Sequence, residues 1–587
     1  MEPHPRRLRR STIVFSLALC LGGEARLWAI VSNLPEVNIV HNAQAEHVDQ
    51  DTLRNLVAGG QKQQAFTTAF ENGDELFETV FNALDGVGAN VGNGQRFTRV
   101  PRADLKGTNE WFNHRPNRAT GPNASACNSC HGKPFDDGTA DASANVHRDT
   151  FRTGQISQFI ERNTPHLFGL GAVQRLAEEM TDALAADRQH LIDLTCTYGG
   201  TQTVNLRAKG VGFGTLSATR TNVTPCAVKF NTDGVRGVDF QPSVDNPAAP
   251  TDLIIRPFQW KGSVPFIRDF NRGASHNELG MQAVEIAGDN VDGDGDGVVN
   301  ELTIGDQTAL AVYLAAQPRP TTLLELNNLG LIEPLSATRI ANINRGREVF
   351  GAIGCDSCHK ASLPLDKPIF SEPSQNAAYR DGTAFPAGQS PIVRGVDPRY
   401  AITFNLTKDQ PDNVITRSDG SIFHLGSLRR DSSDRAIVEL FSDLKRHEMG
   451  SRLAEPVNEI AGNDVTPIPL NPRNRNTPST FMTRSLWGIG STAPYMHDGR
   501  ATTLAEAILE HATGASDDPS EAAAERRNYL NLPAADKKAL IAFLNNLVLF
   551  KLQVVNGAEV AVTAPQGVTL RVPRGRKERP VTVESPE

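Results

Sequence analysis

A short pattern, Cys-x-x-Cys-His, occurs twice in the 587-residue chain. The two copies comprise Cys127, Cys130 and His131, and Cys355, Cys358 and His359. This spacing is typical of c-type haem attachment, in which two thioether bonds fix the porphyrin edge and the histidine is placed beneath the iron. A thioredoxin-like dithiol does not require the histidine, and a zinc site uses four sulfur or histidine ligands. The pattern therefore predicts two covalently bound c-type haems, with His131 and His359 as proximal iron ligands.

The sixth iron ligands decide what each haem does. An electron-transfer haem has both axial positions filled by the protein, whereas a catalytic haem keeps one position open. Downstream of the second cluster, Thr503 and Glu506 form a capping-box pattern at the start of a predicted helix. On that helix His511 falls on the same apolar face as Leu504 and Ile508, at helical spacing. We expect His511 to be the sixth ligand of the second haem; the alternative is a core histidine bound to a backbone carbonyl.

The stretch TAPYMHDGRATTLAEAILEH around this helix resembles the C-terminal signature of the bacterial di-haem cytochrome c peroxidase superfamily. In that superfamily the sixth ligand follows the histidine of HDG by 14 residues, an offset that leads from His497 to His511. Typical bacterial peroxidases carry methionine there, so the chain instead resembles the di-haem oxidoreductase branch, to which the rubber oxygenases are related. The resemblance spans roughly residues 60 to 550 and includes GPNASACNSCHGKPFDDG, FSDLKRHEMG and RSLWGIG. It implies that His447 and His497 lie near haem propionates.

The same resemblance assigns roles around the first haem. Trp260 matches the tryptophan that lies between the two haems, where an aromatic ring can relay an electron. Glu278 and His276, in ASHNELGM, are the candidates for the distal acid that moves a proton during peroxide cleavage. The alternatives are an ordinary core tryptophan and a surface loop. The sixth position of this haem is expected to be open or filled by His147 or His166.

Residues 289–306, DNVDGDGDGVVNELTIGD, alternate aspartate and glycine. Oxygen ligands at every second position suit Ca²⁺, and we expect a structural calcium ion here. The predicted ligands are Asn290, Asp292, Asp294, Asp296 and Glu301. A register that begins at Asn290 ends on Glu301, whereas one that begins at Asp292 ends on Thr303, so the register stays open. The alternative is a solvated acidic loop.

The N-terminus predicts export. Four arginines within residues 6–10 precede a short apolar run over residues 12–22, as in a secretory signal, which we assign to residues 1–29. Cys20 raises a lipid anchor as a less favoured alternative, and we expect the periplasm. In an oxidising compartment the two remaining cysteines, Cys196 and Cys226, are expected to form a disulfide rather than two buried thiols. The net charge of −8 argues against a nucleic-acid partner.

The predicted fold is mainly α, with two cytochrome c-like haem domains, long loops and a few short strands. Residues 50–320 form the N-terminal domain with the catalytic haem and the calcium loop. Residues 335–552 form the C-terminal domain with the electron-transfer haem, and residues 553–587 are a polar tail. Helices are expected over residues 60–83 and 534–550, and strands or loops over the Thr-rich and Val-rich residues 196–245.

The favoured function is a periplasmic di-haem cytochrome c peroxidase. It would reduce hydrogen peroxide at the N-terminal haem with electrons that arrive through the C-terminal bis-histidine haem. The donor would be a small monohaem cytochrome c or a cupredoxin, and the protein a monomer or homodimer. The alternatives are a haem dioxygenase similar to the rubber oxygenases, a non-catalytic two-haem relay, and a relative of the methylamine dehydrogenase maturation enzyme. The last is disfavoured because the tyrosine ligand of that enzyme is absent at position 511.

Overall fold

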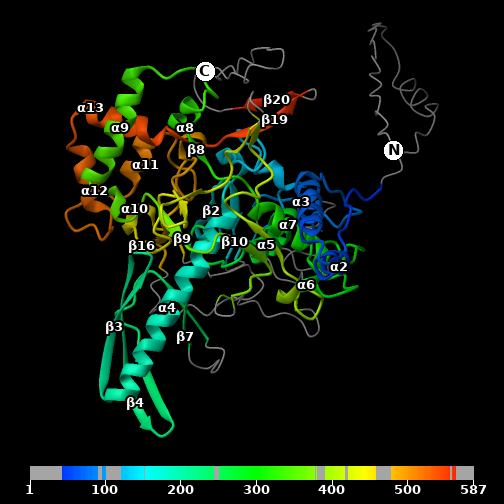
Figure 1. Ribbon diagram of the computed structural model, residues 1–587, viewed down its shortest axis with the longest axis horizontal. Helices are drawn as coiled ribbons and strands as arrows, with labels where there is room; N and C mark the ends of the chain where they lie inside the picture. The colour runs from blue at the N-terminus through cyan, green and yellow to red at the C-terminus, as the bar shows by residue number, and fades with distance from the viewer. Residues whose placement is uncertain are drawn as a thin grey trace. The chain divides into compact units, whose positions relative to one another are not determined.

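The computed structural model describes residues 42–89, 96–100, 120–150, 153–242, 250–376, 379, 390–416, 421–457, 477–555 and 558–562 (Figure 1). The predicted signal segment, with Cys20, lies outside these residues, as does most of the predicted tail. No helix within the described part has both the length and the apolar character needed to cross a membrane.

Three helices of the N-terminal half pack on one another: α2 (Gln50–Ala58), α3 (Lys62–Glu78) and α7 (Ile304–Ala315). Helix α7 begins with a capping box in which Thr303 and Asp306 bind each other's backbone N–H groups. Gly73 lies where α3 crosses α7, and a Cβ atom there would overlap the carbonyl of Ala309. This close crossing places the end of α3 against the short 3₁₀ turn that carries the first Cys-x-x-Cys-His cluster.

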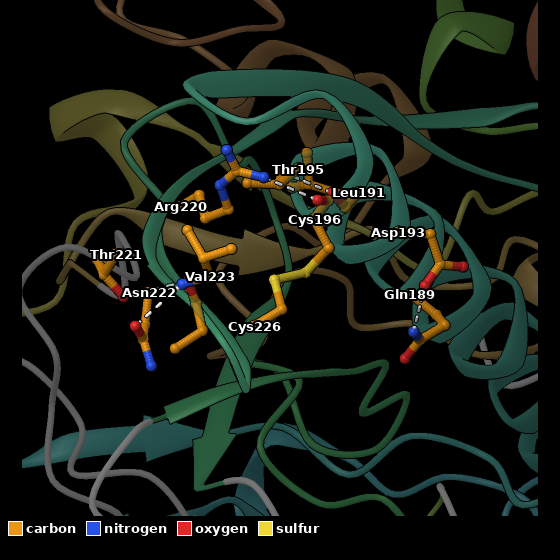
Figure 2. Close-up of a disulfide and its surroundings, with 11 residues drawn as sticks. Gln189, Leu191, Asp193, Thr195, Cys196, Arg220, Thr221, Asn222, Val223 and Cys226 are labelled. Atoms are coloured by element: carbon orange, nitrogen blue, oxygen red, sulfur yellow. Dashed lines mark hydrogen bonds between the residues drawn. A yellow bond between two sulfur atoms is a disulfide. The ribbon is translucent and has the colours of Figure 1, made fainter.

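Helix α4 (Leu170–Tyr198) is long, and its C-terminal half packs on an antiparallel sheet (Figure 1). The sheet consists of β3 (Thr201–Ala208), β4 (Val211–Val223) and β5 (Cys226–Asn231). Cys196, near the end of α4, forms a disulfide with Cys226, with Cα atoms 5.9 Å apart (Figure 2). Arg220 donates to the backbone carbonyl of Cys196 at 2.9 Å and joins the helix to the sheet a second time.

The segment that follows builds one wall of the molecule's first cavity. Strands β6 (Asp239–Pro242) and β7 (Pro250–Ile254) lead to α5 (Ile267–Ala274), and a π-helical turn (Ser275–Leu279) continues α5. The turn ends at Gly280, which has a φ of +81°. Arg268 of α5 forms buried ion pairs with Glu285 of α6 (Val284–Ala287) and with Glu372. These pairs fix the face of α5 that points away from the cavity.

The C-terminal half contains a second group of helices. Helix α9 (Ala337–Ala352) packs closely on α13 (Ala534–Leu544), with Gly346 at the crossing. Helices α11 (Leu504–Glu510) and α12 (Ala523–Leu530) lie beside them. The predicted capping box of Thr503 and Glu506 is confirmed at the start of α11. A 3₁₀ turn directly after α9 carries the second Cys-x-x-Cys-His cluster.

The prediction of a mainly α fold is wrong. Of the residues that the structure describes, about 35% are helical and 18% form strands, which are spread over several small sheets. The strands lie in the long segments that connect the helices. Short antiparallel strand pairs satisfy backbone groups of these segments that would otherwise be buried without partners. The other short strands are β1 (Val146–Arg148), β2 (Ile160–Arg162), β8 (Thr321–Thr322), β9 (Leu363–Leu365), β10 (Ile369–Glu372), β11 (Ile402–Asn405), β12 (Val414–Thr416), β13 (Ile422–His424), β14 (Arg429–Arg430), β15 (Ala436–Val438), β16 (Arg446–Glu448), β17 (Thr480–Met482), β18 (Leu547–Val548), β19 (Lys551–Val555) and β20 (Ala558–Val562). The two remaining short helices are α8 (Leu323–Asn328) and α10 (Gly450–Leu453).

The largest hydrophobic core draws on both halves of the chain, for example on Phe66 and Leu176 and also on Phe404 and Leu440. A second core lies among α9, α11 and α13, with Phe350, Leu504 and Phe543 as members. The division into domains at residues 50–320 and 335–552 stays a prediction.

Candidate functional site: two cavities that meet at a tryptophan

The first cavity, of about 1470 Å³, has the Cys127–His131 cluster in its wall. His131 Nδ1 donates to the carbonyl of Gly138 at 3.2 Å, which selects the tautomer that leaves the Nε2 lone pair for a metal. Burial lowers the pKa of His131 to about 4. The imidazole is therefore neutral near pH 7, as an iron ligand must be.

Burial also acts on the cysteines of the two clusters. It raises the pKa of Cys127 to about 12, that of Cys130 to about 11 and that of Cys355 to about 12. A redox dithiol needs a lowered thiol pKa, because the thiolate is the reactive form. These thiols are protonated at neutral pH, which fits structural attachment to a haem edge better than thiol–disulfide chemistry.

The second cavity, of about 1380 Å³, has His359 and His511 among its lining residues. His359 Nδ1 donates to the carbonyl of Phe441 at 3.0 Å, and His511 Nδ1 donates to that of Ala507 at 2.7 Å. Their ring centroids lie 6.5 Å apart, with the ring planes inclined at 69°. Bonds from a metal to imidazole nitrogen are about 2 Å long, so two rings that ligate one iron from opposite sides have centroids about 6 Å apart. The pair therefore fits a haem iron between the two rings.

Helix α5 and its π-helical turn line the first cavity. Glu278 is half-buried and faces the cavity together with Asn271, Asn277 and Phe270. The carboxylate of Glu278 adds to the effect of burial in raising the pKa of Cys130, which places its charge near that sulfur. His276 is buried at 1% exposure but is not among the lining residues. The structure brings Glu278, and not His276, to the cavity.

His166 and His147, the two other candidate ligands of the first haem, differ in their contacts. His166 lines the cavity, but its Nε2 donates to the carbonyl of Trp487 at 2.9 Å and its Nδ1 accepts from the N–H of Phe168. Both ring nitrogens are thus used by the polypeptide. His147 lines neither cavity, and its Nε2 lies 3.9 Å from a carboxylate oxygen of Glu161.

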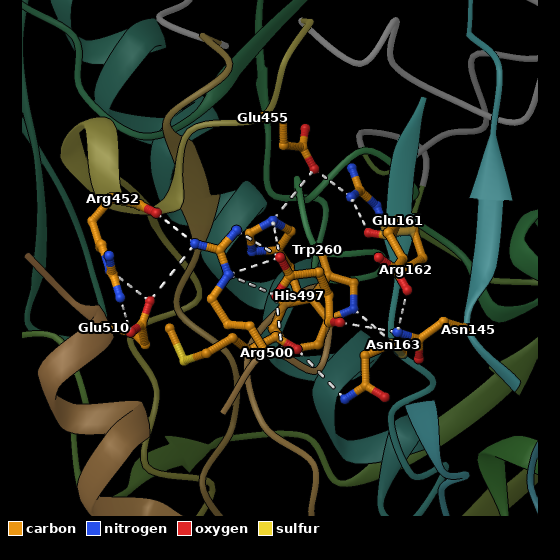
Figure 3. A network of polar contacts seen from close by, with 12 residues as sticks. Asn145, Glu161, Arg162, Asn163, Trp260, Arg452, Glu455, His497, Arg500 and Glu510 are labelled. Atoms are coloured by element: carbon orange, nitrogen blue, oxygen red, sulfur yellow. Dashed lines mark hydrogen bonds and ion pairs between the residues drawn. The ribbon is translucent and has the colours of Figure 1, made fainter. Parts of the chain in front are cut away.

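Of the residues that the structure describes, Trp260 and Arg484 line both cavities. The indole N–H of Trp260 donates to the carbonyl of Asn163 at 2.9 Å, and its ring lies 6.5 Å from that of His497 (Figure 3). The guanidinium carbon of Arg484 lies 5.2 Å from the centre of the indole ring. Trp260 is therefore held rigidly at the junction, in a position suited to an electron relay.

Two histidines expected near the haem edges line the second cavity. Although burial opposes it, hydrogen bonds to Asp443, Cys358 and Glu521 raise the pKa of His447 to about 11, so this ring is cationic. Burial lowers the pKa of His497, which lies 3.9 Å from Glu455. Both rings are therefore fixed by charged groups of the protein rather than exposed as ligands.

The acidic loop brings together three of its predicted calcium ligands. Carboxylate oxygens of Asp292, Asp294 and Asp296 lie within 4.8 Å of one another. Asp292 also accepts backbone N–H groups of the loop, and Arg96 donates to Asp296 at 2.9 Å. The other two predicted ligands are engaged elsewhere: Asn290 bonds twice to Asn300, and Glu301 accepts the N–H of Gln282 at 2.8 Å.

Residues 413–547 match the family model described as "Di-haem oxidoreductase, putative peroxidase". This part of the chain is similar to that family, which confirms the resemblance seen in the sequence and supports a di-haem oxidoreductase with haem cofactors.

Comparison with solved structures and curated proteins adds little. A solved structure described as the crystal structure of a MauG-like protein associated with microbial copper homeostasis is 18% identical over 41% of this chain, with a TM-score of 0.21. The match spans about half of that chain, 52%, and its TM-score is too low to support a conclusion about the fold. No curated protein matches the chain.

Sequence reasoning missed Arg484, Asn271 and Asn277. The signal for Arg484 was a single basic residue within the apolar run FMTRSLWGIG. No pattern in the sequence marks the two asparagines, because their position on the cavity depends on how α5 is held by its buried ion pairs.

Proposed function

We propose that the protein is a periplasmic cytochrome c peroxidase. It reduces hydrogen peroxide at a c-type haem attached to Cys127 and Cys130, and it receives electrons through a c-type haem attached to Cys355 and Cys358. The observation that supports this most is the difference between the cavities. The second has an imidazole on each side, whereas the described histidines that line the first are His131 and the already engaged His166.

Each haem supplies an iron that changes oxidation state by one electron. The overall reaction consumes one peroxide, two electrons and two protons and yields two waters. Glu278, on the cavity wall, would take a proton from one oxygen of the peroxide and return it to the departing hydroxyl. Asn271 and Asn277 offer amide groups that orient the bound peroxide.

Two alternatives differ in what they require of the first cavity. A dioxygenase for an apolar alkene favours an apolar distal wall, and Phe270, Ala274 and Leu314 do line this cavity. The three polar side chains on the same wall favour peroxide instead. A simple relay requires a second protein ligand for the first iron, and the described histidines do not offer one in their present contacts.

We also propose that Asp292, Asp294 and Asp296 hold a calcium ion, in a loop without the EF-hand register. Three carboxylates this close repel one another, and a divalent cation offsets that repulsion. Arg96, the cation already paired with Asp296, is the competing counter-charge.

Stopped-flow spectroscopy tests the peroxidase proposal. Protein reduced by one electron is mixed with hydrogen peroxide in one experiment and with O₂ in another, and the haem bands are followed together with turnover of a reduced small cytochrome. Rapid oxidation by peroxide with catalytic turnover supports the proposal. Reaction with O₂ and none with peroxide would replace it with the oxygenase, and no reaction with either oxidant would replace it with the relay.

A further inference from the structure

Arg484 lies at the junction of the two cavities and lines both. Its guanidinium stacks over Trp260, with 5.2 Å between the guanidinium carbon and the ring centre. The hydrogen bond it makes is long: Nη1 donates to the carbonyl of Gln259 at 3.5 Å. This hydrogen bond uses one of the five N–H donors of a guanidinium that lines both cavities.

No carboxylate forms an ion pair with Arg484 in the part of the chain that the structure describes. The neighbouring cations differ in this respect. Arg162 pairs with Glu455 (Figure 3). Lys261 also pairs with Glu455 and donates to three backbone carbonyls. Arg500 pairs with Asp498. Burial lowers the pKa of Arg484 to about 10, so the group remains charged at neutral pH.

A buried guanidinium without an anion is costly, because desolvation is not offset by a partner. A haem edge carries two propionates, and the fork of an arginine matches a carboxylate with two parallel hydrogen bonds. We propose that Arg484 is the shared counter-charge of the two haems and binds a propionate of each. This inference rests on the proposed placement of a haem in each cavity.

The position of Arg484 beside both haems affects their midpoint potentials. A cation this near both haems stabilises the reduced form of each, so it raises both midpoint potentials. A cation over an indole also disfavours removal of an electron from that ring, and bound propionates offset this effect. Arg484 is thus a positioning residue that sets the potentials of both haems and the electrostatic environment of Trp260.

The test replaces Arg484 with glutamine and measures both haem potentials by spectroelectrochemical titration. We expect both to fall, each by about a tenfold change in the reduction equilibrium, which corresponds to about 59 mV for one electron. Arg452→Gln is the matched control, because Arg452 pairs with Glu510 and lines neither cavity. The control should leave both potentials unchanged.

A second variant keeps the test decisive if Arg484→Gln does not fold. Arg484→Lys keeps the charge but loses the fork, so the propionate bending bands in the resonance Raman spectrum should shift for both haems. Unchanged bands in Arg484→Lys, or unchanged potentials in Arg484→Gln, would overturn the inference, and a shift confined to one haem would overturn the shared role. Haem content is measured in every sample. Two haems with unmoved potentials refute the role of Arg484 alone, whereas fewer than two haems in the wild type refute the proposed haem placement as well.

Discussion

Replacement of His511 gives the sharpest test of the bis-histidine cavity. The ring of His511 lies 6.5 Å from that of His359, at the C-terminal end of α11, and its Nδ1 is fixed by the carbonyl of Ala507. His511→Met exchanges an imidazole for a thioether of similar reach. His511→Ala removes the ligand altogether.

The expected size of the effect follows from the ligand exchange. Axial ligands tune haem potentials over about 0.8 V, and methionine in place of histidine raises the potential. Exchange of one of two axial ligands should raise the potential of one haem by on the order of 0.1 V, which is between one and two tenfold steps in the reduction equilibrium. The other haem should move much less, because its own ligands are unchanged. In His511→Ala the same haem should become high-spin.

Potentials are measured by titration, and spin states by electron paramagnetic resonance and magnetic circular dichroism. His147→Met is the control, since His147 lines neither cavity and lies near a carboxylate of Glu161. If His511→Ala keeps the same number of low-spin haems as the wild type, the ligand lies elsewhere. The geometric argument from the paired imidazoles would then be wrong.

Three further predictions concern other residues. Glu278→Gln should lower kcat/KM for peroxide about a hundredfold with haem content unchanged, and an unaltered rate would remove Glu278 from the mechanism. Burial raises the pKa of Glu372 from 4.5 to about 6, against the opposing effect of Arg268, so the folded state favours the protonated form. The free energy of unfolding should therefore fall by about 2 kcal/mol as the pH rises from 4.5 through 6, and Glu372→Gln should flatten this slope in denaturant titrations; an equally steep slope in the variant would contradict the assignment. Removal of calcium with a chelator should lower the Tm of the wild type but not that of Asp294→Asn, whereas equal Tm losses would place the ion elsewhere.

Several local features could be read from the sequence because short-range chemistry determines them. The Thr503–Glu506 capping box needs only a fixed spacing of two side chains, and the structure contains it. The disulfide partners Cys196 and Cys226 were reached by elimination, and the structure bonds them. The prediction of the fold class was wrong for the opposite reason. Some of the short strands pair segments that lie far apart in the chain, as Leu547–Val548 does with Thr321–Thr322, and no local pattern predicts such a partner.

The calcium loop shows that residue spacing also fails to determine the full ligand set within a single motif. Alternating aspartates predicted an oxygen-lined site, and three of them do converge. The sequence does not determine which flanking residues join them. Asn290 adopts a positive φ of 57° and pairs with Asn300, and the carboxylate of Glu301 turns to the backbone of Gln282. These are tertiary contacts that compete with the ligand register suggested by spacing alone.

The distal candidates Glu278 and His276 cannot both serve the first haem, and the reason is geometric. Successive side chains of a helix are rotated by about 100°, so residues two apart point in nearly opposite directions. The wider π-helical turn reduces the rotation per residue but keeps such a pair on opposing sides. Because Arg268 and Arg272 anchor the outer face of α5 to Glu285, the helix cannot rotate to exchange the two.

The two cavities share their proximal construction, a Cys-x-x-Cys-His turn whose histidine Nδ1 is bound to a backbone carbonyl, and they differ in the element opposite that histidine. In one cavity the end of a helix presents an imidazole; in the other an anchored helix presents a carboxylate. A coordinating ligand opposite one iron and a proton carrier opposite the other suit conduction and peroxide cleavage, respectively.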